Sequence, residues 1–279
     1  MTEYAGIKGT RVKYLSSDVT LNDTAKGQVW YNSTTGLNKS FVELKAWASG
    51  GSLTTPRRAL WGCGLSDAAL GFGGYASGQG AKNATEEYNG FQWSNGGNMS
   101  QVGYHLSGAG TQTAAVVMAR GQPFATIGVT TEEYGGTSWT SGGGLGTSRY
   151  GMGSAGTLTA GVVFGGASPV TGKTEEYDGS SWTESGDLNQ ARLGSAGSGT
   201  QTAALAFGGA PGPSGQVSSE RYDGTSWAVA PNLASRRFYL AGCGTQALSL
   251  AFGGFSSPSK TNVTEEFTFA FLSKTVTDS

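Results

Sequence analysis

Hydrophobic and polar positions follow a unit that the chain repeats. Each copy contains small and polar residues, a short apolar run ending in Phe-Gly-Gly, a variable loop, Thr-Glu-Glu-Tyr, a tight turn and a tryptophan. Five segments occupy the Thr-Glu-Glu-Tyr position: 85–88, 131–134, 174–177, 219–222 and 264–267. Such repetition predicts one supersecondary unit that buries its hydrophobic face only against copies of itself.

The copy that ends at Trp227 predicts four short strands. Residues 195–200 are small and polar, and residues 203–207 are apolar and end at a Gly-Gly breaker. Residues 219–222 form the third predicted strand. Asp223-Gly224 is expected to be the hairpin turn that leads into the fourth strand at the tryptophan. Four antiparallel strands per repeat predict a β-propeller blade.

The spacing of the repeat predicts the number of blades. Trp47, Trp93, Trp139, Trp182 and Trp227 stand 46, 46, 43 and 45 residues apart, intervals that suit a four-stranded blade. The first of these tryptophans has no Glu-Glu-Tyr before it, and the last Glu-Glu copy has no tryptophan after it. The two incomplete ends therefore complement each other, and the fold class we predict is an all-β, five-bladed propeller.

The predicted domains follow from this closure. A strand around residues 41–48 is expected to complete the last blade, whose three inner strands come from about 238 to 269, so that no strand edge is left exposed. Residues 41–270 are then the propeller and 271–279 a C-terminal tail. Residues 1–40 are a leader, with a strand at 28–31, a turn at 33–36 and the segment 41–48 as the returning strand. Residues 1–25 are expected to be free for attachment.

The Gly-Gly doublets, the Glu-Tyr pairs and the tryptophans that follow them resemble the kelch repeat family in kind and order. The doublets stand at 73–74, 165–166, 208–209 and 253–254, whereas the second copy has Met118-Ala119-Arg120 instead. The resemblance covers residues 41–270, although the family more often has six or seven blades. Residues 12–18 and 27–36 resemble leaders of structural proteins of tailed bacteriophages, particularly marine ones. These resemblances imply a phage virion protein.

Composition narrows the classes of partner. Charged residues make up 13% of the chain, the net charge is −1 and no basic stripe is visible, so we expect no nucleic-acid partner. Apolar runs are strand-sized, so no membrane insertion is expected. The first residues lack a basic start and an apolar core, so no secretion signal is predicted. Aromatic residues at a fixed register argue against disorder.

Candidate catalytic residues are few. Neighbouring Glu side chains in a strand point to opposite faces, so each Glu-Glu pair predicts a structural role, with one Glu accepting bonds from a loop or an arginine. His105 is the single histidine, too few for the copper site of galactose oxidase or for a serine triad. Asp and Gly are adjacent in the turns, unlike in the sialidase Asp box. We expect no enzyme activity and no cofactor or metal.

Six arginines recur in the linkers between blades and are predicted to bond loop carbonyls: Arg57, Arg58, Arg149, Arg192, Arg236 and Arg237. Cys63 and Cys243 occupy one repeat position, at which we align Ala109, Ala155 and Ala196. We expect the cysteines to approach each other at the closure seam. We favour small buried side chains over a disulfide, which requires Cα atoms within about 7 Å. The repeating tryptophans predict packing between blades.

Binding is expected on the loops between second and third strands, which vary while the framework repeats. The candidate ligand-facing residues are Tyr75, Arg120, Phe124 and Phe255. The function that this pattern predicts is a non-enzymatic virion protein, tail-associated or on the capsid surface, present in several copies beside other virion proteins. A glycan-binding lectin or adhesin is the alternative, and a host-surface glycan is the expected small partner. A lectin with one equivalent sugar site on every blade would repeat its binding loops, and these loops do not repeat.

Overall fold

The structure is a computed structural model that describes residues 13–17, 29–40, 51–118, 129–212, 214–256 and 259–268. The chain divides into two compact units, Met1–Ser49 and Gly50–Ser279. All regular structure in the described residues is β, and none of it is a helix that could cross a membrane.

The first unit holds one small sheet. β1 (Lys13–Leu15) pairs in parallel with β2 (Val29–Asn32), which pairs antiparallel with β3 (Leu37–Ser40). The predicted first strand and its turn are confirmed, with Gly36 at φ 69° closing the turn. The returning strand follows this turn directly as β3, earlier than predicted, and the predicted segment 41–48 lies outside the described residues. Lys13–Leu15 also belongs to the sheet, whereas we expected residues 1–25 to be free.

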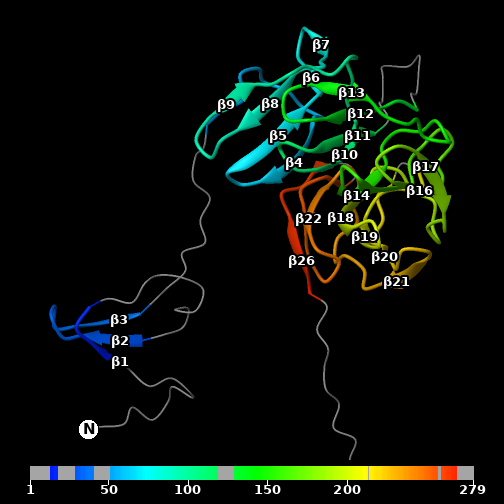
Figure 1. Ribbon diagram of the computed structural model, residues 1–279. Helices are drawn as coiled ribbons and strands as arrows, with labels where there is room; N and C mark the ends of the chain where they lie inside the picture. The colour runs from blue at the N-terminus through cyan, green and yellow to red at the C-terminus, as the bar shows by residue number, and fades with distance from the viewer. Residues whose placement is uncertain are drawn as a thin grey trace, which may run out of the picture. The chain divides into compact units, whose positions relative to one another are not determined.

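The second unit is a five-bladed β-propeller, as predicted (Figure 1). The first blade consists of β4 (Trp61–Leu65), β5 (Ala68–Phe72), β8 (Thr85–Tyr88) and β9 (Trp93–Asn95). The second consists of β10 (Ser107–Gly110), β11 (Ala115–Met118), β12 (Thr131–Tyr134) and β13 (Trp139–Ser141). The third consists of β14 (Gly153–Thr157), β15 (Ala160–Phe164), β16 (Thr174–Tyr177) and β17 (Trp182–Ser185).

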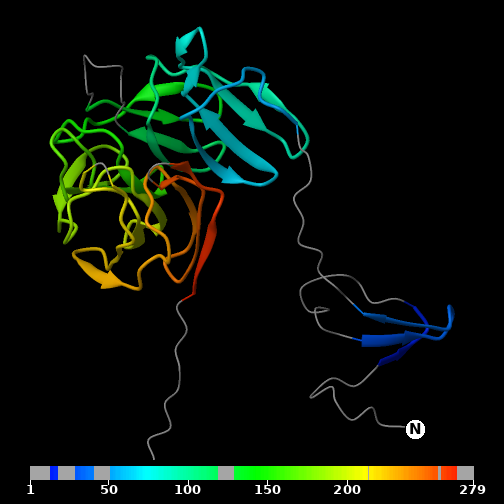
Figure 2. The same cartoon turned by 180° about the vertical axis from the view of Figure 1, so that it is seen from behind.

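The fourth blade consists of β18 (Ala196–Thr200), β19 (Ala203–Phe207), β20 (Ser219–Tyr222) and β21 (Trp227–Ala230). The fifth shows β22 (Ala241–Gly244), β23 (Leu248–Phe252) and β26 (Thr264–Thr268). Two short hairpins stand in loops: β6 (Tyr75–Ala76) with β7 (Gly80–Ala81), and β24 (Phe255–Ser256) with β25 (Ser259–Lys260). β4, β10, β14, β18 and β22 are the innermost strands, because consecutive members of this set contact one another from blade to blade. Figure 2 shows the same blades from behind.

The turn between the third and fourth strands is the predicted hairpin at Asp-Gly, and the pairing of its two strands sets the length of the loop. Tyr177 pairs with Trp182, which leaves a four-residue loop. Only the glycine takes a positive φ, 93° at Gly179, while the Asp178 carboxylate accepts bonds from the backbone N–H groups of Ser180 and Ser181. The aspartate therefore caps the turn, and the adjacent glycine supplies the left-handed residue.

The second, third and fourth blades are each tied to the blade before by their repeated aromatic residues. The indole N–H groups of Trp139, Trp182 and Trp227 donate to the threonine Oγ1 atoms that open the third strands of the preceding blades, at 2.9–3.0 Å. The hydroxyls of Tyr134, Tyr177 and Tyr222 donate to Glu87, Glu133 and Glu176. The prediction that the tryptophans pack between blades is confirmed for these three, and the second glutamate of the first three pairs holds a tyrosine.

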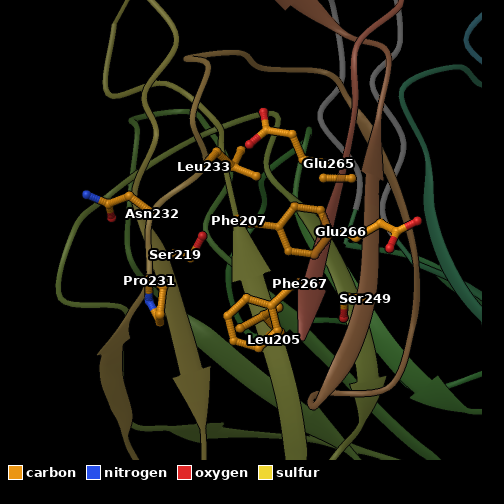
Figure 3. Close-up of a pocket in the computed structure, with 11 residues that line it drawn as sticks. Leu205, Phe207, Ser219, Pro231, Asn232, Leu233, Ser249, Glu265, Glu266 and Phe267 are labelled. Carbon is orange, nitrogen blue, oxygen red and sulfur yellow. The ribbon is translucent and has the colours of Figure 1, made fainter. Parts of the chain in front are cut away.

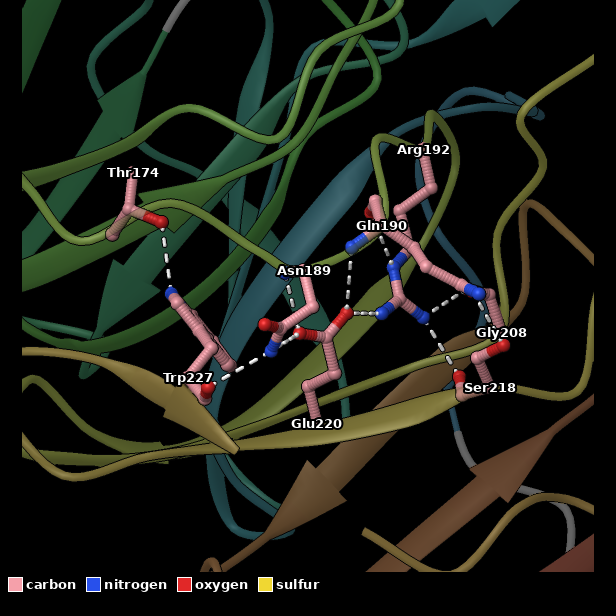
Figure 4. Close-up of polar contacts among 8 residues, drawn as sticks. All are labelled: Thr174, Asn189, Gln190, Arg192, Gly208, Ser218, Glu220 and Trp227. Carbon is pink, nitrogen blue, oxygen red and sulfur yellow. Dashed lines mark hydrogen bonds and ion pairs between the residues drawn. The ribbon is translucent and has the colours of Figure 1, made fainter. Parts of the chain in front are cut away.

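In four of the five copies the first glutamate binds a linker arginine. Four arginines, each almost fully buried, lie against such a carboxylate: Arg57 on Glu86, Arg149 on Glu175, Arg192 on Glu220 and Arg237 on Glu265. Arg192 also donates to the carbonyls of Gly208 and Ser218, and the Glu220 carboxylate accepts from the backbone N–H of Asn189 (Figure 4). The predicted structural role of these arginines and glutamates is confirmed.

A groove in the fifth blade lies where the other blades hold a tryptophan (Figure 3). Its lining includes Leu205, Phe207, Ser219, Leu233, Ser249, Ala251 and Phe267. One blade earlier the equivalent residues surround Trp227: Val162, Phe164, Thr174, Leu188, Ala204, Ala206 and Tyr222. The groove thus has the shape and chemistry of an indole site. The fourth strand predicted for this blade, with Trp47, lies outside the described residues.

The fifth blade packs less closely on the first than the others pack on their neighbours. Leu250 and Phe252 are 37% and 39% exposed, whereas their equivalents Leu205 and Phe207 are 1% and 2% exposed. The apolar face of β23 therefore borders a cavity at this seam.

Candidate functional site

Five linker residues surround one end of the central channel and share an unusual backbone conformation. The members are Ala59, His105, Gly151, Gly194 and Tyr239. Each stands two residues before an inner strand begins, and their φ angles are 53°, 53°, 63°, 64° and 50°. Three backbone hydrogen bonds join members of neighbouring blades: His105 N–H to the Ala59 carbonyl at 3.2 Å, Gly194 N–H to the Gly151 carbonyl at 2.7 Å, and Tyr239 N–H to the Gly194 carbonyl at 2.7 Å. We call this set the channel-mouth ring.

Glycine is the residue that the channel-mouth ring favours, and two of its five members are glycines. A left-handed backbone costs roughly 1–2 kcal/mol at an ordinary L-residue, and it is uncommon for bulky side chains. The structure nevertheless places an imidazole at His105 and a phenol at Tyr239. Residues held in such conformations cluster at functional sites, so these two rings mark the channel mouth as a candidate site.

The two rings belong to a continuous row of six aromatic side chains, which we call the aromatic arc. Ring centroids of His105 and Tyr239 lie 5.0 Å apart across the mouth. On one side the row continues through Tyr104 to Tyr75, at 5.0 and 5.8 Å. On the other side it continues through Phe238 to Phe255, at 5.1 and 5.2 Å. The arc therefore joins the linker between the first two blades to the linker between the last two.

Below the ring lies a cavity of about 610 Å³, within the range of small-molecule sites. It follows the inner strands and extends into the seam between the fifth and first blades, where Trp93 and Phe252 line it. Its walls are mostly apolar. Ser195, only 4% exposed, also lines it, and its Oγ has no hydrogen-bond partner among the described residues. The cavity thus offers a buried hydroxyl beneath an aromatic mouth.

Electrostatics at the mouth favour a neutral imidazole. Burial, followed by the positive charge of Arg58, lowers the pKa of His105 from its usual 6.5. The Arg58 guanidinium lies 5.0 Å from the centroid of the Tyr75 ring, a cation–π contact at the end of the arc. Arg58 is exposed, in contrast to its buried neighbour Arg57.

Charge is divided between the two faces of the propeller. Linkers between blades and loops between second and third strands emerge on one face, and the tight turns emerge on the other. Apart from the buried arginines, the described residues of the first face carry Arg58, Lys82, Lys173, Arg236 and Lys260 against one acid, Asp187. The turns of the opposite face carry Asp67, Asp178 and Asp223 and no Lys or Arg among the described residues.

The four predicted ligand-facing residues have different outcomes. Tyr75 and Phe255 are half-buried at the two ends of the aromatic arc, and their backbones bridge to Arg58 and Phe238. Arg120 and Phe124 lie outside the described residues. The sequence argument missed Tyr104, Phe238 and Tyr239, and it treated His105 as an ordinary packed or surface side chain. The signal was present: the position of His105 and Tyr239 holds glycine in two other copies.

The cysteines line the same cavity but remain free thiols. Their alignment needs a correction, since pairing between the inner strands places Ser198, and not Ala196, at their repeat position. Burial raises the pKa of the Cys63 thiol to about 12, so this thiol is a poor nucleophile at neutral pH. In the part of the chain that the structure describes, no three His, Cys, Asp or Glu side chains gather into a metal site.

No protein-family model matches this chain, and no curated protein matches it.

Proposed function

We propose that this protein is a non-enzymatic recognition protein that presents the linker face of its propeller to a surface ligand. The observation that carries the proposal is the aromatic arc, in which His105 and Tyr239 keep large rings at positions that favour glycine. Rigid sheets that carry an irregular, chemically distinct face are the usual construction of a binding surface.

The repeated carboxylates support a binding role over catalysis. Each described first glutamate accepts bonds from a linker, and Glu87, Glu133 and Glu176 hold tyrosine hydroxyls of the next blade. These acids are therefore engaged in joining the blades. A general acid or base needs a carboxyl within reach of a substrate proton, whereas these carboxylates bind groups of the protein itself.

The biological setting that we propose is a phage particle. The resemblance of residues 12–18 and 27–36 to leaders of tailed-phage structural proteins supports it, as does the kelch-like order of the repeat. In this proposal the protein is a tail-associated or capsid-surface component, present in several copies and attached through its leader to other virion proteins. Mass spectrometry of purified particles tests this setting: peptides of the chain should be recovered in stoichiometric amounts, and their absence would refute the setting.

The ligand that the aromatic arc favours is a host-surface glycan, which would make the protein a lectin or adhesin. Half-exposed aromatic rings with adjacent polar groups are typical of sites that bind amphipathic ligands. Binding of the fluorescently labelled full chain, presented multivalently to a broad glycan array, tests the recognition role. We expect a reproducible signal on one class of saccharide. A blank array would refute glycan recognition and leave an architectural role on the particle.

A further inference from the structure

The side chains of the channel-mouth ring differ from blade to blade although the backbone of the ring repeats. Its five members have one backbone conformation and one place in the repeat, but their side chains range from none at Gly151 and Gly194 to large rings at His105 and Tyr239. The propeller therefore folds around glycine here. The rings contribute something that the fold itself does not require, and they meet at 5.0 Å in front of the cavity.

The second observation is the sign of the charge beside the arc. Arg58 contacts the arc through Tyr75, and the linker face around it carries exposed cations with a single acid among its described residues. Lys173 on this face is already paired with Glu184. The opposite face, with its aspartates, has the reverse polarity. An anionic ligand is thus attracted to the face that carries the arc.

We propose that the aromatic arc binds an anionic saccharide, whose sugar ring lies against Tyr239 and His105 and whose carboxylate is bound by Arg58. This inference rests on the proposed recognition function and names the ligand class of the same site. The C–H face of a pyranose is apolar and matches an aromatic ring, and a guanidinium binds a carboxylate through two parallel hydrogen bonds. Sialic acids and uronic acids share this chemistry.

A single-stranded nucleic acid is the rival anionic ligand, because its bases also stack on aromatic rings. Such ligands are bound along a basic groove that follows many phosphates. Here Arg58 contacts the arc, Lys82 lies in the same blade, Arg236 and Lys260 belong to the fifth blade, and Lys173 in the third is paired with Glu184. These few cations do not line one continuous groove. One carboxylate beside one stacked ring matches this arrangement better than a phosphate backbone does.

The experiment measures affinities of the full chain for four probes: sialyllactose, a galacturonate oligomer, neutral lactose and oligo-dT. We expect one of the two carboxylated saccharides to bind at least about tenfold more tightly than lactose, and added salt to weaken that binding. Sialyllactose and the galacturonate oligomer distinguish the two sources of the carboxylate. Equal affinity for lactose, or tighter binding of oligo-dT, would overturn the proposal.

Variants locate the site without disturbing the fold. Tyr239→Gly and His105→Gly restore the residue that two other blades use, so the folded state is retained and thermal melting checks it. We expect Tyr239→Gly and Arg58→Gln each to weaken saccharide binding at least about tenfold. Phe91→Ala, which removes an 84% exposed ring from a turn of the opposite face, is the matched control and should bind like the wild type.

The outcomes separate the two levels of inference. If the wild type binds none of the saccharides here or on the glycan array, glycan recognition itself fails. If the wild type binds but Tyr239→Gly and Arg58→Gln bind equally well, the recognition function stands and the aromatic arc is not its site.

Discussion

Removing Arg192 is expected to destabilise the propeller strongly. Its side chain is 0% exposed, and its guanidinium is bound to Glu220, itself 2% exposed, and to the carbonyl of Ser218 at 2.7 Å. In the Arg192→Ala variant the Glu220 carboxylate stays buried without its counter-charge, although it keeps the backbone N–H of Asn189 at 2.7 Å. Breaking a buried pair from one side costs about 3–5 kcal/mol.

The expected loss in the free energy of unfolding converts to a shift of the melting temperature. For a domain of this size, 1 kcal/mol shifts the midpoint by about 2–4 °C, so Arg192→Ala should lower it by about 6–20 °C. The matched control is Lys173→Ala, which breaks the ion pair with Glu184. Those side chains are 37% and 62% exposed, so solvent and salt already screen the interaction. The control should shift the midpoint little.

Two results would refute this reasoning. If Arg192→Ala and Lys173→Ala melt at the same temperature, burial does not make the arginine–glutamate pair important. A second variant separates charge from volume, because Glu220→Gln keeps the shape of the side chain and removes its charge. If Arg192→Ala is strongly destabilised while Glu220→Gln melts like the wild type, the loss comes from the cavity and not from the ion pair.

Three further predictions concern other parts of the propeller. Gly208→Val should destabilise the protein in urea far more than Gly212→Val. A Cβ at Gly208 (φ 65°) would lie 2.8 Å from the Arg237 carbonyl oxygen, whereas none of the described atoms lies within 4 Å of a Cβ at Gly212. Equal urea midpoints for the two variants would contradict the strand map. Trp227→Ala should cost about 3–5 kcal/mol, because its indole is 6% exposed, packs in a buried cluster with Phe164 and donates to the Thr174 Oγ1; an unchanged denaturation midpoint would contradict this packing. His105 has a depressed pKa in the folded state, so the unfolded chain takes up its proton first and stability should fall as the pH drops below about 6.5. Melting at pH 7.5 and 5 should show a larger loss for the wild type than for His105→Gly, and equal losses would refute the assignment.

The blades could be predicted from sequence because their determinants are local. The apolar run at residues 203–207, the glycines after it and the tyrosine–tryptophan pair that follows all act within one hairpin or between adjacent hairpins. The structural role of the Glu-Glu pairs was predictable for the same reason, since a residue that recurs from blade to blade stabilises the blade itself. The hairpin at Asp178-Gly179 was predicted from its dipeptide, but the length of its loop was not, because the pairing of the flanking strands decides that length.

The candidate site was only half predictable. Tyr75 and Phe255 could be chosen as aromatic residues in variable loops, but nothing local relates them to each other. His105 and Tyr239 are far apart in the sequence and meet only because the ring of blades brings the second and fifth linkers to one channel mouth. The sequence by itself determined a five-fold repeat, its strands and its buried pairs, since these depend on residues within one or two neighbouring units. Only the tertiary structure decided which departures from the repeat face one another, because that depends on the circular arrangement of all five blades.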